Sequence, residues 1–332
     1  MIITRTPLRV SFFGGGTDYP VWYNGNGGAV LSTTINKYCY ISCRYLPPFF
    51  NYKYRIRYSL REEVQDLSEI QHPAVRECLK YLNISEGIEM VHTSDIPARS
   101  GVGSSSAFTI GFLYALYALK GKMVTKRQLA QEAIDLEQNI IKENVGSQDQ
   151  VAVAFGGLNK IEFKSNNGFD VYPITINKER IDLFHKHLML FFTGFSRNAS
   201  DIASEQIKKT PLKKAELQAL KEMVDRGVNI LNSDSEDIRN FGKLLDEAWA
   251  IKRSLTEKIS TNEIDNIYEV ARKAGAVGGK LLGAGGGGFM LLLAEPELQP
   301  KIKEKLKNLV YVPFAFENLG TQVIMYSTQD FY

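Results

Sequence analysis

A turn rich in glycine and serine, PARSGVGSSSA at residues 97–107, constrains this chain most, because it opens directly into a long apolar stretch. Gly101 and Gly103 permit backbone torsions and close approaches that a side chain would prevent. Free amides at a helix start, together with the helix dipole, favour an anion. The serines add hydroxyls for phosphate oxygens or a metal. The segment predicts a phosphate-binding loop, with an ordinary serine cap on a glycine turn as the alternative.

Length and charge limit the class of protein. The chain has 332 residues, of which 44% are hydrophobic and 23% charged, and its net charge is +3. Single cores seldom grow beyond about 250 to 300 residues, so we expect two domains. Lysines and arginines are spread among acidic residues, and this argues against a nucleic-acid-binding protein.

The cysteines and the apolar segments indicate the compartment. Cys39, Cys43 and Cys78 are odd in number and lack the spacing of a zinc finger, so we expect reduced thiols. The opening MIITRTPLRVSFFGGG carries arginines within its apolar run, and no later segment reaches 18 uncharged apolar residues. We therefore expect a cytoplasmic protein with no membrane partner.

Hydrophobic periodicity predicts alternating strands and helices, and hence an α+β fold. Predicted strands cover residues 2–13, 29–35, 37–45, 52–58, 88–92, 158–163, 169–174, 187–192, 289–294, 310–314 and 322–326. Predicted helices cover residues 74–82, 104–119, 126–141, 199–208, 212–231, 238–255 and 263–274. A charged stretch at 177–186 marks the expected boundary between domains 1–180 and 181–332. The order of elements after it resembles a ferredoxin-like domain.

A glutamate lies on the apolar face of the helix predicted at 126–141. Glu137 is three or four residues from Ala133, Ile134, Ile140 and Ile141, so its side chain is directed inward. An ionised carboxylate is unfavourable in a core unless it has a partner. We expect either a buried ion pair with an arginine or a magnesium ion, which prefers oxygen ligands such as carboxylates and nucleotide phosphates.

Two further charged residues have both an ordinary and a chemical interpretation. Asp149 precedes the apolar run 151–155, where aspartate is a common first-turn residue of a helix. The same position also keeps it available to accept a proton from a substrate hydroxyl. Arg9 lies on an apolar strand, where it either pairs with a buried acid or stabilises a transferring phosphoryl group together with the aspartate.

Three segments in order resemble the GHMP kinases, the family of galactokinase, homoserine kinase, mevalonate kinase and phosphomevalonate kinase. They are residues 5–18, which begin RTPLR and end GGGTD; PARSGVGSSSA, similar to the family pattern P-x-x-x-G-L-G-S-S-A-A with Val102 for leucine; and KLLGAGGGG at 280–288. The resemblance implies a two-domain α+β kinase. Its N-terminal domain is expected to be of the ribosomal-protein-S5-like type and its C-terminal domain ferredoxin-like.

The resemblance also implies roles, by position in the motifs. Asp149 matches the catalytic aspartate and Arg9 the basic residue beside it, while Ser105 and Glu137 match two magnesium ligands. A shift of one residue would put the uncharged Gln138 at the second of these positions. ATP binding falls to Pro97, Gly101, Val102, Gly103, Ser104, Ser105, Ser106 and Ala107, and substrate binding to Gly16, Thr17, Asp18, Ser196, Arg197, Lys280, Gly285 and Gly286.

The implied activity is phosphoryl transfer from magnesium ATP to the anomeric hydroxyl of a sugar. The opening segment is most similar to the bacterial branch of the family that acts on heptose 7-phosphate, for nucleotide-activated heptose and surface polysaccharide synthesis. A phosphorylated sugar requires a distal anion site, for which Ser196, Arg197 and Lys280 are candidates, with solvated basic residues as the alternative. The expected partner is this small-molecule sugar phosphate. A homodimer is also compatible with the sequence.

The sequence also leaves three other functions to consider. One alternative is a galactokinase- or fucokinase-like enzyme for an unphosphorylated sugar. Another is a non-catalytic sugar sensor on the same fold. Residues 283–288 also fit G-x-G-x-x-G, but a helix precedes them and a strand follows, the reverse of a dinucleotide-binding unit.

Overall fold

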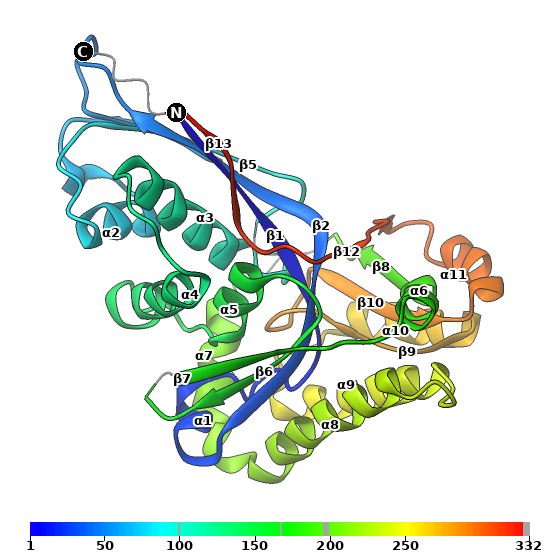
Figure 1. Ribbon diagram of the computed structural model, residues 1–332. Coiled ribbons are helices and arrows are strands. Elements are labelled where there is room, and N and C mark those ends of the chain that lie inside the picture. The colour runs from blue at the N-terminus through cyan, green and yellow to red at the C-terminus, as the bar shows by residue number, and fades with distance from the viewer. Residues whose placement is uncertain (99, 167, 195–198, 328–332) are drawn as a thin grey trace.

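The computed structural model describes residues 1–98, 100–166, 168–194 and 199–327, and this part of the chain folds around two β-sheets (Figure 1). The helices are α1 (Pro20–Asn26), α2 (Pro73–Tyr81), α3 (Ser104–Leu119), α4 (Lys126–Asp135), α5 (Gln148–Phe155), α6 (Lys178–Lys186), α7 (Ala199–Lys209), α8 (Lys214–Asn232), α9 (Arg239–Leu255), α10 (Asn262–Ala274) and α11 (Gln299–Lys305). Short turns occur at η1 (Leu67–Glu69), η2 (Leu136–Ile140), η3 (Thr210–Leu212) and η4 (Pro296–Leu298). The mixed content of helices and sheets confirms the predicted α+β class.

The first sheet is assembled mostly from the N-terminal half of the chain. Its strands are β1 (Ile2–Phe13), β2 (Gly28–Tyr45), β3 (Tyr54–Arg57), β4 (Arg61–Val64), β5 (Ile88–Ser94), β6 (Asn159–Lys164), β7 (Gly168–Pro173), β12 (Phe316–Glu317) and β13 (Gln322–Tyr326). The order is β13-β1-β2-β5-β3-β4, while β6 and β12 pair with other stretches of β2, and β7 pairs with β6. The β3–β5 pair is parallel.

Strand β2 joins two segments that were predicted as separate strands. Asn36, between them, donates its backbone N–H to the carbonyl of Ala315 at 3.0 Å, and its Oδ1 accepts the N–H of Ala315 at 2.7 Å. The pairing with β1 also shifts register between Pro7 and Leu8, as a bulge does. The hydrogen bonds with Ala315 thus stabilise the extended backbone at Asn36, so that β2 continues as one strand across this polar residue.

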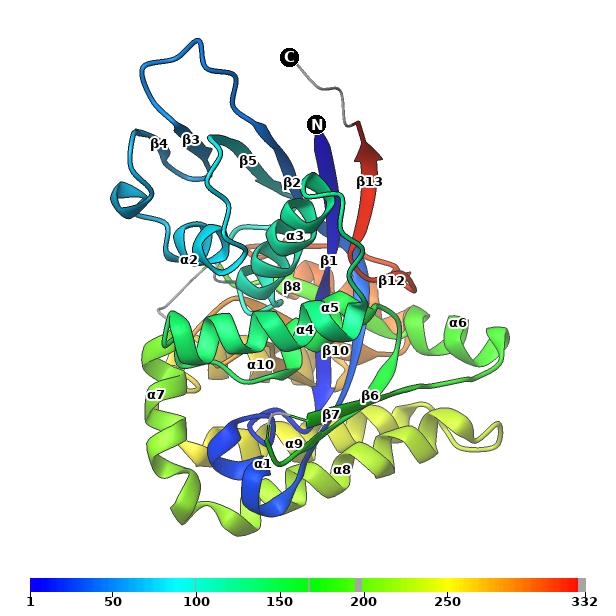
Figure 2. The same ribbon diagram turned by 60° about the vertical axis from the view of Figure 1, so that its left-hand side comes forward.

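Helices cover the strands that lead to the site (Figure 2). Helices α3 and α5 both contact β1 and β2, and α8 contacts the same two strands. The α3 helix is buried over most of its surface, which confirms the prediction of a central helix. Gly111 on α3 allows a close approach, because a Cβ there would lie 2.9 Å from Oγ1 of Thr6.

The second sheet has the order expected of a ferredoxin-like domain. Its strands are β8 (Leu188–Phe192), β9 (Ala276–Leu281), β10 (Phe289–Ala294) and β11 (Val310–Tyr311), arranged β11-β8-β10-β9 and all antiparallel. Strand β9 was not predicted, because its two glycines weaken the local pattern. Packing explains it: a Cβ at Gly278 would lie 1.8 Å from the carbonyl oxygen of Gly242, so α9 approaches the bare backbone of β9 directly.

Two further segments show detail that the sequence pattern did not predict. The charged stretch 177–186 contains helix α6, whose N-cap Asn177 accepts the N–H of Arg180 at 2.7 Å. The helix predicted at 126–141 ends as an α-helix at Asp135 and continues as the π-helical turn η2. Helix α6 is rich in charged residues and lacks a strong apolar pattern. The turn η2 is a local widening of a helix that the sequence predicted correctly.

The end of the chain returns to the first sheet. Strand β13 pairs with β1 from Ile2 to Arg5, and β12 pairs with β2 at Ile35 and Thr34. Figure 2 shows β13 beside β1 at the edge of this sheet. The division near residue 180 stays a prediction, and the structure adds that segments from both sides of it build the first sheet.

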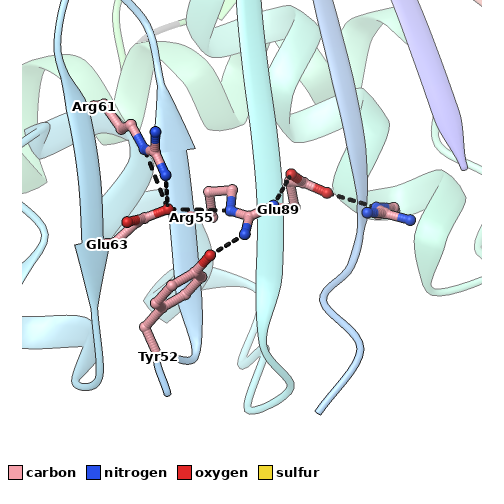
Figure 3. A network of polar contacts seen from close by, with 6 residues as sticks. Tyr52, Arg55, Arg61, Glu63 and Glu89 are labelled. Carbon is pink, nitrogen blue, oxygen red and sulfur yellow. Dashed lines mark hydrogen bonds and ion pairs between the residues drawn. The ribbon is translucent and has the colours of Figure 1, made fainter. Parts of the chain in front are cut away.

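A polar network crosses the outer strands of that sheet (Figure 3). Glu89 on β5 accepts from Arg55 on β3 at 3.0 Å and from Arg44 on β2 at 2.6 Å. Arg55 also contacts Tyr52, and Glu63 pairs with Arg55 at 3.3 Å. The network ties β2, β5, β3 and β4 together by their side chains, as cross-strand pairs do.

Within the described residues, none of the helices combines the length and apolar composition that a membrane crossing requires. Cys39, Cys43 and Cys78 are buried, and none of them forms a disulfide bond within the described residues. Burial raises the pKa of the Cys39 thiol to about 12, so the thiol is protonated and unreactive at neutral pH.

Candidate active site

A cavity of about 270 Å³ lies where β1, the start of α3, α7, α9 and the glycine-rich loop after β9 meet. Its lining contains several residues that carry charge or hydrogen-bonding groups. They are Arg9, Ser11, Asp18, Ser104, Ser105, Ser106, Glu143, Asn144, Gln148, Asp149, Ser200, Gln206, Lys252 and Lys280. Such a concentration of polar groups in one cavity indicates a site for a polar, charged ligand.

Arg9 and Asp149 form an ion pair in this cavity. Nε of Arg9 donates to Oδ1 of Asp149 at 2.8 Å, and Nη2 donates to Oδ2 at 2.9 Å. Nη1 of Arg9 donates to the carbonyl of Gly101, so the guanidinium also contacts the glycine loop. The Arg9 side chain is 3% exposed and that of Asp149 is 24% exposed. The carboxylate is therefore the more accessible partner of the pair within the cavity. A bidentate pair of this kind fixes the carboxylate's orientation.

The glycine loop has the backbone geometry that its sequence predicts. Gly101 and Gly103 have φ of 82° and 77°, and α3 begins after Gly103 with no side chain capping it. A Cβ at Gly103 would lie 3.1 Å from Cγ of Arg9. The carbonyl of Val102 accepts the N–H of Arg9 at 2.9 Å. This hydrogen bond fixes the start of α3 beside β1, and the first amides of the helix stay available for an anion.

The third glycine motif supports this loop. A Cβ at Gly283 would lie 2.5 Å from Cα of Gly101, and one at Gly288 would lie 2.2 Å from the carbonyl oxygen of Ser100. The two loops therefore touch through bare backbone, and side chains at these glycines would force them apart. Gly285 and Gly286 pack instead against Ile259, whose carbonyl accepts the N–H of Gly286 at 2.9 Å.

Glu137 is buried in η2, as its place on the apolar face predicted. Its Oε2 accepts from the hydroxyl of Ser106 at 3.0 Å and from the amide of Gln150. Among the described residues its Oε1 has no hydrogen-bond partner. Burial raises the pKa of Glu137 to about 7. Among the described residues no arginine bonds Glu137, and the neighbouring Gln138 donates to the loop 145–147.

Two buried lysines bring amino groups to the cavity. Nζ of Lys252 donates to the carbonyl of Gly283, and Nζ of Lys280 donates to the carbonyl of Phe12 at 2.9 Å. Burial lowers the pKa of Lys252 to about 8 and that of Lys280 well below its ordinary value. Lys252, still charged at neutral pH, interacts electrostatically with Asp18 and Asp149, and Arg9 pairs with Asp149, an arrangement suited to an anionic ligand.

The structure brings most of the predicted residues to the cavity. Its lining includes the predicted residues Arg9, Gly16, Asp18, Gly101, Gly103, Ser104, Ser105, Ser106, Asp149 and Lys280. The lining does not include Pro97, Val102, Ala107, Thr17, Glu137, Gly285 or Gly286. Ser196 and Arg197 lie outside the described residues, so the structure does not test them.

Two of these placements change how the motif residues are interpreted. Thr17 is fully buried and bonds the backbone of Gly14 and Ala29, so it shapes the turn that presents Asp18. Ser106, rather than Ser105, contacts Glu137. Ser105 lies on the cavity wall. Shared magnesium binding by Ser105 and Glu137 therefore remains a prediction.

Sequence reasoning missed Lys252, Gln148, Gln206 and Ser11. Lys252 had the same signal as Glu137: it lies on the apolar face of its helix with Ala248, Trp249 and Leu255. A polar residue on an apolar face marks a buried site. The two glutamines and Ser11 carried no such signal, because neutral polar residues are common in helices and strands.

A helix start built to hold an anion, facing a carboxylate, an arginine and two lysines, defines a small-molecule phosphotransferase. The chain matches the model of the GHMP kinases N terminal domain over residues 70–157 and that of the GHMP kinases C terminal domain over residues 228–312. The chain belongs to the GHMP kinase family.

Its relatives include kinases for several small molecules. The D-glycero-alpha-D-manno-heptose 7-phosphate kinase of Campylobacter jejuni is 30% identical over 97% of this chain and 98% of its own length. The galactokinase of Thermotoga maritima is 23% identical over 91% of this chain and 92% of its own. The crystal structure of a D-glycero-D-manno-heptose 1-phosphate kinase from Bacteroides thetaiotaomicron matches with a TM-score of 0.77 at 23% identity, and the match covers 98% of this chain and 100% of that one. The fold is thus the two-domain GHMP kinase fold.

Proposed function

We propose that the protein transfers the γ-phosphoryl group of ATP to the anomeric hydroxyl of D-glycero-D-manno-heptose 7-phosphate, giving the 1,7-bisphosphate. One observation carries the chemistry: the Arg9–Asp149 pair lies in the same cavity as the helix start that follows Gly103. The choice of sugar rests on the full-length similarity to the Campylobacter jejuni kinase.

In this proposal, Asp149 acts on the acceptor hydroxyl. A carboxylate oxygen of Asp149 accepts the hydroxyl proton as the sugar oxygen bonds to the γ-phosphorus, and the bond from that phosphorus to the bridging oxygen of ADP breaks. Arg9 keeps the carboxylate aimed through its two hydrogen bonds. Arg9 and Lys252 offset the charge that grows on the transferring group. The amides at the start of α3 bind the phosphates of the nucleotide.

Glu137 fits a magnesium site, because Oε1 is buried with no partner among the described residues and the chemistry of the group is that of a magnesium ligand. Magnesium, when bound, neutralises charge on the nucleotide phosphates. We expect Glu137→Gln to raise the magnesium concentration needed for half-maximal activity by roughly tenfold, since one charged ligand is lost. Titration of activity with magnesium at saturating ATP tests this, and an unchanged magnesium requirement would contradict it.

The substrate is tested by ADP release with a panel of acceptors. The panel contains D-glycero-D-manno-heptose 7-phosphate, the corresponding 1-phosphate, mannose, galactose, fucose, homoserine and mevalonate. We expect the 7-phosphate to have the largest kcat/KM by at least tenfold. A preference for galactose or fucose would retain the kinase and discard the phosphorylated acceptor, and phosphorylation of the 1-phosphate would move the reacting hydroxyl away from the anomeric carbon. Sugar binding without turnover would favour the sensor.

A further inference from the structure

Three polar atoms in the wall of the cavity are buried without a partner among the described residues. Oγ of Ser11, Oε1 of Gln148 and Nε2 of Gln206 make no hydrogen bond within the part of the chain that the structure describes. Buried polar groups are nearly always paired, so three in one cavity require an explanation. Because all three line the same space, a ligand that enters this space can pair them.

Two of these side chains converge on one turn from different helices. Gln206 comes from α7, is 4% exposed, and its Nε2 lies 2.5 Å from where a Cβ of Gly16 would be. Gln148 comes from the first turn of α5, and its Nε2 lies 4.0 Å from where a Cβ of Gly15 would be. The bare backbone at Gly16 leaves the room that the Gln206 amide occupies, and the Gln148 amide lies at ordinary contact distance from Gly15. Asp18, in the same wall, is already engaged by the N–H of Gly16 at 2.9 Å.

The unpaired atoms differ in what they can bind. The Gln206 amide nitrogen donates, the Gln148 amide oxygen accepts, and the Ser11 hydroxyl can do either. A phosphate group only accepts and would leave the Gln148 oxygen unpaired, while an ammonium group only donates and would leave the Gln206 nitrogen unpaired. Neighbouring hydroxyls both donate and accept, so they complement the whole set.

We propose that Gln206 and Gln148, assisted by Ser11, bind hydroxyl groups of the acceptor and thereby determine which polyol the enzyme accepts. This inference deepens the proposed function and rests on it only in taking the acceptor to be a sugar. Lys252, whose charged amino group only donates, binds the anionic part of the reactants, so hydroxyl groups and phosphate are bound by different residues of one cavity.

The test is Gln206→Leu, with Gln218→Leu on α8 as the matched control, since Gln218 is exposed and bonds Glu222. For Gln206→Leu we expect the KM of the best acceptor to rise roughly tenfold, as for one lost hydrogen bond. We expect kcat to change less than about threefold and the KM of ATP to stay the same. The Tm should not fall, because the substitution removes an unpaired buried amide. A residue with a merely structural role would show the opposite pattern.

Deoxy analogues of the best acceptor identify the hydroxyl. Relative to the parent acceptor, one deoxy analogue should have a roughly tenfold lower kcat/KM with the wild-type protein and with the control. With Gln206→Leu the same analogue should lose little, because the amide that bonds this hydroxyl is already absent. Equal acceptor KM for Gln206→Leu and wild type would overturn the inference while leaving the proposed function standing. The expected shift on galactose or another acceptor would support the inference and reject the heptose substrate. A wild-type protein that phosphorylates no polyol in the panel would overturn both.

Discussion

The carboxylate of Asp149 is held at two atoms by Arg9, a residue 140 positions away in the chain. If Asp149 removes the acceptor proton, Asp149→Asn should lower kcat by roughly two to four orders of magnitude. The KM of ATP should change little, because the nucleotide loop is untouched. Coupled measurement of ADP release checks this. Asp170→Asn, at a carboxylate with a side chain 35% exposed that pairs with Lys164, is the control and should keep wild-type activity. If kcat of Asp149→Asn falls by less than tenfold, Asp149 mainly positions the acceptor and does not act as its general base.

The lowered pKa of Lys252 predicts how kcat/KM changes along the alkaline limb of the pH profile. Burial lowers its pKa to about 8, so the side chain is charged at pH 7 and loses its proton as the pH rises through about 8. If that charge stabilises the transferring group, kcat/KM of the wild type should fall above pH 8. Lys252→Met should lower kcat/KM at pH 7 by roughly 100-fold and remove this fall.

The matched control for that experiment is Lys243→Met, on the same helix at an exposed position. It should keep both the activity and the alkaline limb. The Tm of Lys252→Met should not decrease, because an apolar side chain of similar volume replaces a buried charge. Persistence of the limb in Lys252→Met would show that another group titrates.

At the scale of elements, the contact between two glycine loops positions the start of α3. Gly283 has φ of 76°, and a Cβ there would lie 2.5 Å from Cα of Gly101. Gly283→Ala should therefore separate the loops and raise the KM of ATP roughly tenfold. It should also lower the free energy of unfolding by about 2–4 kcal/mol, from left-handed strain and overpacking.

Gly121→Ala separates these two causes. Gly121 has φ of 63° and nothing within 4 Å of its Cβ position, so this variant has the strain without the clash. We expect it to lose about 1 kcal/mol of stability and no affinity for ATP. Thermal unfolding and calorimetric titration with nucleotide measure both. Equal ATP binding by Gly283→Ala and wild type would mean that the loop contact does not position the phosphates.

Elements also show where local sequence patterns were sufficient. The α3 helix is apolar on nearly all sides, and both α3 and strand β1 appear where the sequence predicts them, whereas β4 and β12 of the first sheet were not predicted. Strand β9 has Gly278 where α9 approaches and Gly279 against β10, so the glycines that permit this packing also weaken the apolar pattern of the strand. The turn η2 widens a helix by one residue, which no periodicity specifies.

At the scale of the whole molecule, the last strands close the first sheet. Strand β13 pairs with the beginning of β1, and the hydroxyls of Thr6 and Thr321 meet at 2.8 Å in the core. A chain that ends at residue 315 should lower the Tm by roughly 10 °C or fail to fold, although it retains almost all of the site. Soluble yield and thermal unfolding check this.

A chain that ends at residue 327 is the control, because it keeps every pair between β13 and β1. It should have the Tm of the full chain. An unchanged Tm for the chain that ends at residue 315 would show that the first sheet is stable without its C-terminal strands.

The sequence by itself determined the features that depend on neighbours along the chain. It specified the glycine loop, the buried α3 helix, the inward direction of Glu137 and the resemblance to the GHMP kinases, because torsions and helical periodicity are local properties. Only the tertiary structure decided which distant groups meet. It brought Lys252, Gln148 and Gln206 to one cavity and placed β13 beside β1, since these contacts depend on how separate helices and strands pack together.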